Sequence, residues 1–246
     1  MTVMQKLRDM MTVEGTLHMA LIDPDKQSPE EAGRIAARMR DAGSNAVLIG
    51  GSTGVTNENL TATTVAIKEA SGLPVILFPG SPKALSKELD AILFMSMVNS
   101  SDPAWIIGAQ AYAAPIIKDL GVETIPMGYI IVEPGMKVGE VGKAVPIRHN
   151  EPEKAVAYAL ASEMLGMQLV YLEAGSGADR PVPPEMVSAV KSSIDVPLIV
   201  GGGIRTPEAA AAAREAGADI IITGTLLEQC QDDSVLKAVV AAAKGV

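Results

Sequence analysis

The sequence has few aromatic side chains, one cysteine and two histidines among its 246 residues. Aromatic residues make up 3% of the chain and hydrophobic residues 48%, so its core must be built mainly from Ala, Val, Ile, Leu and Met. The single cysteine, Cys230, excludes an intrachain disulfide and favours a reducing, cytoplasmic location. His18 and His149 are too few and too far apart to predict a zinc site.

Long hydrophobic runs and an excess of positive charge are also missing. No apolar run reaches the roughly 20 residues of a membrane-spanning helix, and the charged N-terminus does not resemble a secretory signal. The formal net charge of −9 argues against non-specific binding of nucleic acids. An anionic ligand remains compatible with this charge, because backbone amides can bind phosphate.

What the sequence does contain is a series of eight short apolar runs, several of them continuous rather than alternating. Continuous runs are typical of parallel strands that helices cover on both faces of a sheet. Their number predicts a single (β/α)8 barrel, a TIM barrel, over residues 1–246. An open doubly wound sheet is the alternative, weakened by the lack of a G-x-G-x-x-G motif after the first run. The expected strands are 17–22, 46–51, 74–79, 91–98, 124–132, 168–172, 197–200 and 219–223.

Helices are expected between several of these strands, over residues 29–42, 151–165, 183–193 and 206–216. The first begins with the start signal Ser28-Pro29-Glu30 and stops at Gly43. Two segments depart from the regular alternation of strand and helix. Residues 80–90 are too few for a full crossover helix, so the third helix is expected to be short or missing. Residues 133–150 predict a long loop, which is often functional.

Glycine-rich segments follow the last strands, at the end of the barrel where active sites are assembled. Gly202 and Gly203 follow the seventh strand, and Gly224 and Thr225 follow the eighth. Glycine exposes backbone N–H groups without a Cβ, so these segments predict a phosphate site. The alternative is that they only form tight turns.

Candidate catalytic and metal-binding residues lie at two further strand ends. Tyr171 and Glu173 alternate on one face of the sixth strand, and if that face is the lumen, Glu173 is a candidate general base for a substrate hydroxyl. Asp23 and Asp25 follow the first strand, where two carboxylates suit a hard cation such as Mg²⁺. Ser52 offers a neighbouring hydroxyl. The alternatives are a packing tyrosine, a solvated glutamate and an Asp-Pro-Asp turn.

Eight segments then identify a family resemblance. LIDPDK, IGGST, FPGS, MVNSSDPAWIIG, GYIIVEPG, YLEAGSGA, VGGGIRTPE and TGTLLE occur in this order from about residue 15 to the C-terminus. With them the chain resembles the archaeal geranylgeranylglyceryl phosphate synthases and their bacterial prenylglyceryl phosphate synthase relatives. The resemblance implies a barrel that has lost its third helix, in agreement with the short 80–90 segment. It also implies a Mg²⁺-dependent prenyltransferase that joins geranylgeranyl diphosphate to the C3 hydroxyl of sn-glycerol 1-phosphate, forming the first ether bond of archaeal membrane lipids.

The resemblance also assigns roles to individual residues. It places Mg²⁺ on Asp23 and Ser52. In the implied reaction Glu173 would orient and deprotonate the hydroxyl, and Tyr171 is the second candidate catalytic residue. Some relatives carry a basic residue where this chain has Leu21. The glycerol-phosphate site falls on Tyr171, Leu172, Glu173, Ala174, Gly175, Ser176, Gly177, Gly202, Gly203, Gly224 and Thr225.

The implied prenyl chain needs an apolar groove, expected in the room left by the third helix and lined by residues 95–107 and 129–132. A homo-oligomer and a transient contact with a membrane surface are further expectations. Two other functions remain open: an isomerase or cyclase of another phosphate-binding barrel type, which needs a second catalytic acid and no groove, and a non-catalytic phosphate-binding barrel.

Overall fold

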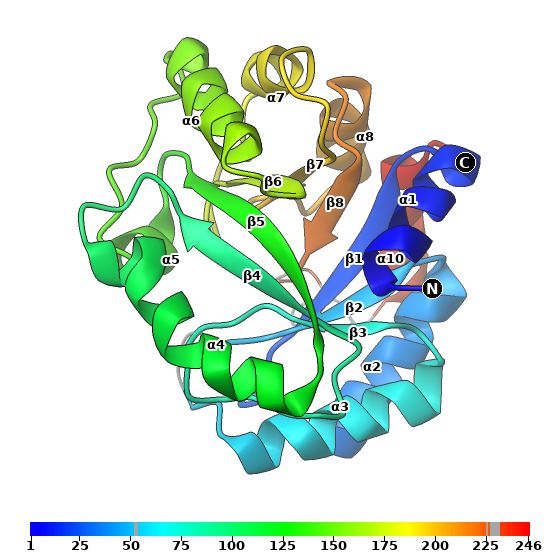
Figure 1. Cartoon of the computed structure of the whole chain (residues 1–246). Helices are drawn as coiled ribbons and strands as arrows, with labels where there is room; N and C mark the ends of the chain where they lie inside the picture. Colours follow the sequence, from blue (N-terminus) through cyan, green and yellow to red (C-terminus); the bar gives the residue numbers. More distant parts are fainter. Residues whose placement is uncertain (52–53, 225, 227–231) are drawn as a thin grey trace.

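The strands close into a barrel in a computed structural model that describes residues 1–51, 54–224, 226 and 232–246. Neighbouring strands are parallel and follow the order of the chain from β1 to β8, with β8 pairing back to β1 (Figure 1). The expected (β/α)8 fold is therefore confirmed, and each expected strand agrees with the structure to within two residues at either end. The strands are β1 (Leu17–Ile22), β2 (Ala46–Ile49), β3 (Val75–Leu77), β4 (Ala91–Met97), β5 (Glu123–Ile131), β6 (Leu169–Glu173), β7 (Leu198–Gly201) and β8 (Ile220–Thr223).

Local capping signals define the helices. At the start of α2, the Ser28 hydroxyl accepts the Glu31 N–H, and the helix ends at Gly43 in the left-handed conformation with φ of 102°. The helices are α1 (Val3–Glu14), α2 (Pro29–Ala42), α3 (Asn57–Ser71), the π-helix η1 (Ala104–Gly108), α4 (Ala109–Leu120), α5 (Met136–Val141), α6 (Pro152–Met164), α7 (Pro184–Lys191), α8 (Pro207–Glu215) and α10 (Asp233–Lys244). Among these described helices, none is long and apolar enough to cross a membrane.

The helix that would follow β3 is missing, as expected. Residues 78–90, all of them described, run from β3 to β4 as a loop that contains turns but no helix (Figure 1). The Asp90 carboxylate anchors the end of this loop, because it accepts the Val75 N–H at 2.8 Å and pairs with Lys68 Nζ at 2.9 Å. Ile92 and Phe94 of β4 therefore line a pocket beside this loop.

Apolar side chains form two layers, one inside the barrel and one between the barrel and its helices. Alternation along each strand sends one side chain inward and the next outward. Tyr129 and Tyr171 belong to the inner layer, whereas Ile130 and Leu172 belong to the outer one. The inner layer also includes Val3, Met4 and Leu7 of α1.

The helix α1 closes the N-terminal end of the barrel. Its first N–H groups, those of Val3 and Met4, donate to the carboxylate of Glu123, the first residue of β5. This leaves the opposite end, where the strands end, open for a site. The expected loop 133–150 lies at that end, and it contains the short helix α5, which the sequence did not signal.

Candidate active site

A buried acid lies among aromatic rings at the C-terminal end of the barrel lumen. Glu173, the last residue of β6, is 7% exposed, and its Oε1 accepts the Gly175 N–H at 2.6 Å. The hydroxyls of Tyr171 and Tyr129 also hydrogen-bond to this carboxyl group. Burial raises the pKa of Glu173, and these three hydrogen bonds oppose that rise. The arrangement suits a base that accepts a proton from a bound hydroxyl.

The two tyrosines are positioned by strand register. Tyr129 of β5 is the direct neighbour of Tyr171 on β6, and their rings lie 5.1 Å apart, edge to face. Phe78 packs against both rings, at 5.4 Å from Tyr129 and 5.9 Å from Tyr171. Burial and the adjacent Glu173 raise the pKa of both tyrosines well above 10, so that their hydroxyls remain protonated and can donate to the acid.

A glycine-lined pocket opens above this acid. Gly202 and Gly203 have positive φ angles of 83° and 74°, which side chains rarely adopt. An added Cβ would lie 2.5 Å from Glu173 Oε1 at Gly202 and 2.9 Å from the Arg180 carbonyl carbon at Gly203. Glycine is therefore needed where the loops after β6 and β7 meet. The pocket spans about 380 Å³, counted to its open mouth, and is lined by Leu21, Tyr171, Glu173, Ser176, Gly202, Gly203, Ile204, Arg205, Ile222, Thr223 and Gly224.

A second acidic group follows β1. Asp23 Oδ1 is buried and has no hydrogen-bond partner among the described residues, while Oδ2 lies 3.5 Å from Lys26 Nζ. Burial and the neighbouring Asp25 carboxyl raise the pKa of Asp23 to about 7. No cluster of three or more His, Cys, Asp or Glu residues suited to a metal occurs in the described part of the chain. A cation here would therefore need a further ligand of another kind.

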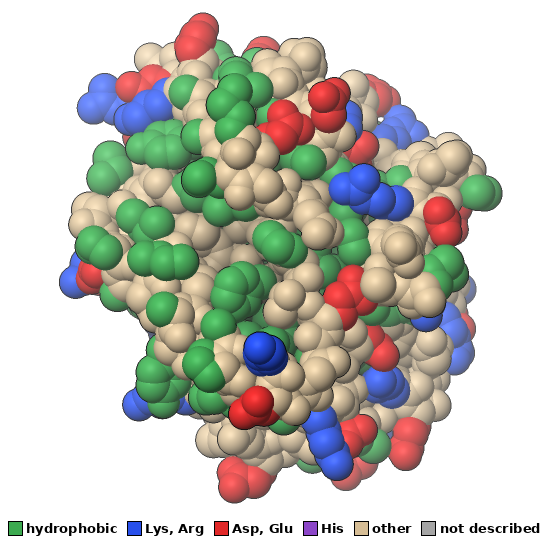
Figure 2. Space-filling view, in the orientation of Figure 1, with side chains coloured by type: hydrophobic (Ala, Val, Ile, Leu, Met, Phe, Trp, Pro, Cys, Tyr) green, Lys and Arg blue, Asp and Glu red, His purple; other side chains and the backbone are tan. Residues whose placement is uncertain are grey.

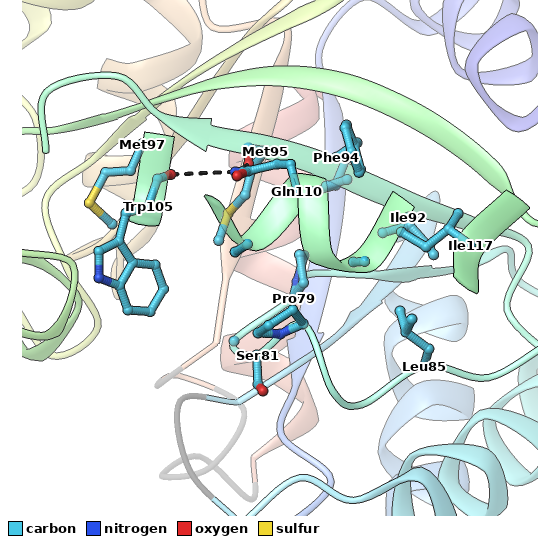
Figure 3. A pocket seen from close by; sticks show the side chains of 15 residues that line it. Pro79, Ser81, Leu85, Ile92, Phe94, Met95, Met97, Trp105, Gln110 and Ile117 are labelled. Carbon is cyan, nitrogen blue, oxygen red and sulfur yellow. Dashed lines mark hydrogen bonds between the residues drawn. The ribbon is translucent and has the colours of Figure 1, made fainter. Parts of the chain in front are cut away.

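A separate apolar pocket lies where the missing helix would pack. It holds about 540 Å³, counted to its open mouth, between the loop after β3, the strand β4 and the helices η1 and α4. Figure 3 shows Trp105 and Met97 at one end and Leu85 and Ile117 at the other. The residues that line it are Pro79, Gly80, Ser81, Pro82, Leu85, Ile92, Leu93, Phe94, Met95, Met97, Trp105, Ala109, Gln110, Ala113 and Ile117.

Comparison with known proteins identifies the family of this chain, because residues 8–243 match the PcrB family. The chain belongs to the PcrB family. It is 59% identical to the geranylgeranylglyceryl phosphate synthase of Thermococcus kodakarensis over 213 residues, which are 87% of this chain and 84% of the relative. It is 54% identical to the synthase of the same name from Methanosphaera stadtmanae over 219 residues, which are 89% of this chain and 90% of the relative.

A solved structure shows the same likeness in three dimensions. The geranylgeranylglyceryl phosphate synthase of Thermoplasma acidophilum, in complex with its substrate sn-glycerol-1-phosphate, superposes with a TM-score of 0.96. The sequence identity is 43%, and the match covers 100% of both chains.

The structure of this PcrB-family chain brings most of the predicted site residues together. Tyr171, Glu173, Ser176, Gly202, Gly203 and Gly224 all line the glycine-lined pocket. The side chains of Leu172 and Ala174 point outward into the layer beneath the helices, and Gly175 and Gly177 do not line the pocket. Ser52 and Thr225 lie outside the described residues.

One part of the expected groove is wrong for this PcrB-family chain. Residues 129–132 do not line the apolar pocket, because Tyr129 and Ile131 face the lumen and Ile130 and Val132 face the outer layer. The pocket is lined instead by the loop after β3. Sequence reasoning also missed Tyr129 as a partner of Glu173, although two tyrosines at matching positions on adjacent strands could have suggested it.

Arg205 is a further pocket residue that the sequence analysis did not single out. It follows the three glycines after β7, and it lines the glycine-lined pocket of the PcrB-family chain. The VGGGIR segment contained this arginine, but its side-chain direction could not be inferred from the spacing alone.

Proposed function

We propose that this PcrB-family chain is a prenyltransferase that joins geranylgeranyl diphosphate to the C3 hydroxyl of sn-glycerol 1-phosphate. The proposal rests chiefly on one observation, a buried acid held by two tyrosines in the glycine-lined pocket, with a separate apolar pocket close to the same strand ends. The names of the relatives and the bound substrate of the Thermoplasma acidophilum structure support it.

In the proposed reaction the glycine-lined pocket holds the phosphate of glycerol 1-phosphate, and Glu173 orients the C3 hydroxyl. As the hydroxyl oxygen bonds to C1 of the prenyl group, the bond from C1 to the diphosphate oxygen breaks. The hydroxyl proton passes to the Glu173 carboxylate. General base catalysis of this kind contributes about 10²–10⁴ in rate, and holding both reactants in place contributes further.

The residues after β1 fit the proposed Mg²⁺. Asp23 presents a buried oxygen that lacks a hydrogen-bond partner among the described residues, and Asp25 adds a second carboxyl group beside it. Ser52, the other expected ligand, lies outside the described residues. When bound, Mg²⁺ supplies positive charge that stabilises the leaving diphosphate. Asp23 and Ser52 would hold it, and Asp25 tunes the charge of the Asp23 carboxyl.

We assign the prenyl chain to the apolar pocket. Met95, Met97 and Trp105 pack against the inner layer of the barrel, so this end of the pocket faces the reacting groups. The chain would then run outward over β4 toward Leu85 and Ile117. Burial of the apolar tail contributes binding energy of roughly 25 cal/mol for each Å² removed from water.

A homo-oligomer is the proposed assembly. Residues 103–117 carry no charge, and Ile107, Tyr112 and Ile116 are 62%, 57% and 42% exposed. Figure 2 shows hydrophobic side chains gathered over the side of the molecule where α4 and α5 lie. Analytical ultracentrifugation tests this proposal, and a monomer at all concentrations would reject it. Binding to lipid vesicles would instead support the predicted transient membrane contact.

The function is tested by incubating the protein with Mg²⁺, sn-glycerol 1-phosphate and, separately, C15, C20, C30 and C35 prenyl diphosphates. Mass spectrometry should find the C20 ether and free diphosphate, with little product from sn-glycerol 3-phosphate. A longer ether would replace the proposed prenyl substrate. Binding of glycerol 1-phosphate without any ether product would indicate a non-catalytic barrel. A rearranged sugar phosphate formed from another substrate would indicate an isomerase.

A further inference from the structure

Arg205 joins the two loops that enclose the glycine-lined pocket. Its Nη2 donates to the Ala178 carbonyl oxygen at 2.8 Å, so an arginine after β7 holds the loop after β6. Close packing brings the same two loops together nearby, since a Cβ at Gly203 would meet the backbone of Arg180 and Pro181 at 2.9 Å. Removing the Arg205 side chain would therefore loosen one wall of the pocket.

The Arg205 guanidinium also has a donor without a partner. Its Nε is buried and makes no hydrogen bond with any described residue. A buried, unpaired donor on a charged group costs free energy unless a ligand satisfies it. Because the Arg205 side chain also lines the pocket, a small movement of the guanidinium would bring this unpaired N–H to an acceptor bound there.

The charges in the pocket favour an anion as that acceptor. Among the described lining residues, Arg205 is the one cation and Glu173 is the one acid. Glu173 already accepts hydrogen bonds from Gly175 and from two tyrosines. Leu21 contributes only an apolar wall. The chain as a whole carries a net charge of −9, which disfavours the approach of a phosphate dianion.

We propose that Arg205 is a phosphate-binding residue of this site: its Nε–H donates to a phosphate oxygen, while its Nη2–H keeps the loop after β6 closed around the ligand. This assignment rests on the proposed function for its substrate, sn-glycerol 1-phosphate. Lysine could supply the charge but not both hydrogen bonds, because it lacks the fixed planar fork of a guanidinium. Through these two hydrogen bonds, Arg205 links binding of the phosphate to the closed position of the loop after β6.

The test compares Arg205→Gln and Arg205→Lys with the parent and with the control Arg34→Gln, which removes an exposed arginine paired with Glu31 on α2. Calorimetric titration with sn-glycerol 1-phosphate alone measures Kd at low and high salt, and steady-state rates give both KM values. Arg205→Gln should raise Kd by about 10- to 100-fold, the loss of a hydrogen bond to a charged group. Arg205→Lys should fall between Arg205→Gln and the parent, and the salt dependence should weaken in Arg205→Gln.

A purely structural role would give a different pattern. If Arg205 binds the phosphate, the KM for the prenyl diphosphate and the Tm should stay close to the parent values in both variants. An unchanged Kd for glycerol 1-phosphate overturns the proposal, as does a lower Tm with equal damage to both KM values. If the parent makes no ether product but its affinity for glycerol 1-phosphate still depends on Arg205, the proposed function fails and this assignment stands.

Discussion

Glu173 is buried where a charge is costly, yet the proposed reaction needs its carboxylate. Three hydrogen bonds, from Gly175, Tyr171 and Tyr129, offset part of that cost. A carboxylate stabilised by donors on one side can accept a proton from a substrate hydroxyl on the other. The two tyrosines thus support the acid without taking the proton themselves, because burial keeps both of them protonated.

Replacing Glu173 with glutamine tests its role as the base. Glu173→Gln keeps the shape of the side chain but cannot accept the hydroxyl proton, so kcat should fall by about 10²–10⁴. The Kd for glycerol 1-phosphate should change far less. Steady-state kinetics and calorimetry measure the two effects, with the exposed Glu185→Gln as a control. A nearly normal kcat would remove Glu173 from the mechanism.

The two carboxyl groups after β1 should differ in their importance for the metal. Asp23→Asn removes the negative charge and replaces one carboxyl oxygen with an NH2 group at the site of the unpartnered oxygen, so the Mg²⁺ concentration for half-maximal rate should rise by about tenfold or more. Asp25→Asn should have a smaller effect. Titration of the rate with Mg²⁺ compares the variants. Greater sensitivity of Asp25→Asn would show that the ligand assignment is wrong.

At the scale of structural elements, the loops after β6 and β7 depend on glycine for their close approach. Gly203→Ala should strain a backbone with φ of 74° and press against the loop at Arg180 and Pro181. The KM for glycerol 1-phosphate should therefore rise, by about tenfold or more if the cost exceeds 1.4 kcal/mol. The KM for the prenyl diphosphate should stay nearly constant.

Gly72→Ala is a matched control for this variant. Gly72 has a similar φ of 67°, but a Cβ there meets nothing within 4 Å. It should lower stability through backbone strain alone and leave both KM values unchanged. Equal damage to the two KM values in Gly203→Ala would mean that the two substrates are not held at separate places.

The loop after β3 and the helix α4 should together limit the prenyl chain. Ala113 is buried and lines the apolar pocket, so Ala113→Phe should fill space and shift the preferred substrate from C20 toward C15. Ala111→Phe, on the exposed face of the same helix, should leave the preference unchanged. The ratio of kcat/KM for C15 and C20 diphosphates measures this. No shift in Ala113→Phe would place the chain elsewhere.

Strands and several helices could be predicted because their signals are local. Continuous apolar runs mark the strands, and Ser28 with Gly43 marks both ends of α2. The missing helix followed from chain length alone, because residues 80–90 are too few. Alternation predicted that Tyr171 and Glu173 share one face of β6, whereas it did not decide whether that face is the lumen. Contacts between distant segments could not be predicted, since they depend on the register and packing of strands that the sequence does not reveal.

Three examples show what that limit means. Tyr129 was expected in the groove wall, but its register with Tyr171 turns it toward Glu173. The helix α1 closes the barrel through hydrogen bonds to Glu123, a residue far away in the sequence. Arg205 reaches a carbonyl group on the neighbouring loop, a contact without any local signal.

At the scale of the whole molecule, hydrogen bonds and an ion pair stabilise the closed barrel where its first and last strands meet. His18 of β1 is fully buried, and its ring nitrogens hydrogen-bond to Ser44 Oγ at 2.8 Å and to Thr223 Oγ1 of β8 at 2.9 Å. Lys244 of α10 pairs with Glu14 of α1 at 2.6 Å and donates to the Gly43 carbonyl oxygen at 2.9 Å. These contacts hold the two ends of the chain to the same side of the barrel.

The stability of the fold should fall in mild acid because of His18. Burial, with a smaller contribution from the charge of Lys244, lowers the pKa of His18 to about 3 from its ordinary value of 6.5. Above pH 6.5 the ring is neutral in both the folded and unfolded chain. Below it, only the unfolded chain takes up the proton, which costs the folded state up to about 1.4 kcal/mol for each pH unit.

Urea unfolding between pH 7 and pH 4 measures this dependence. His18→Gln should lower stability at pH 7 through lost packing and hydrogen bonds, but its free energy of unfolding should depend less steeply on pH than that of the parent. The Asp and Glu residues titrate in both proteins, so their contribution to the pH dependence cancels when the two slopes are compared. Identical slopes would show that His18 does not contribute to the acid sensitivity.

The helix missing after β3 has a consequence for how such an enzyme can diversify. Residues 79–85 of the loop that replaces it belong to no strand. One contact that holds the loop in place is a single hydrogen bond from the Leu85 N–H to Asn57 Oδ1. Substitutions in this loop can reshape the apolar pocket without breaking the barrel. Selection could therefore retune the length of the prenyl chain proposed to bind there while Glu173 and the barrel scaffold stay fixed.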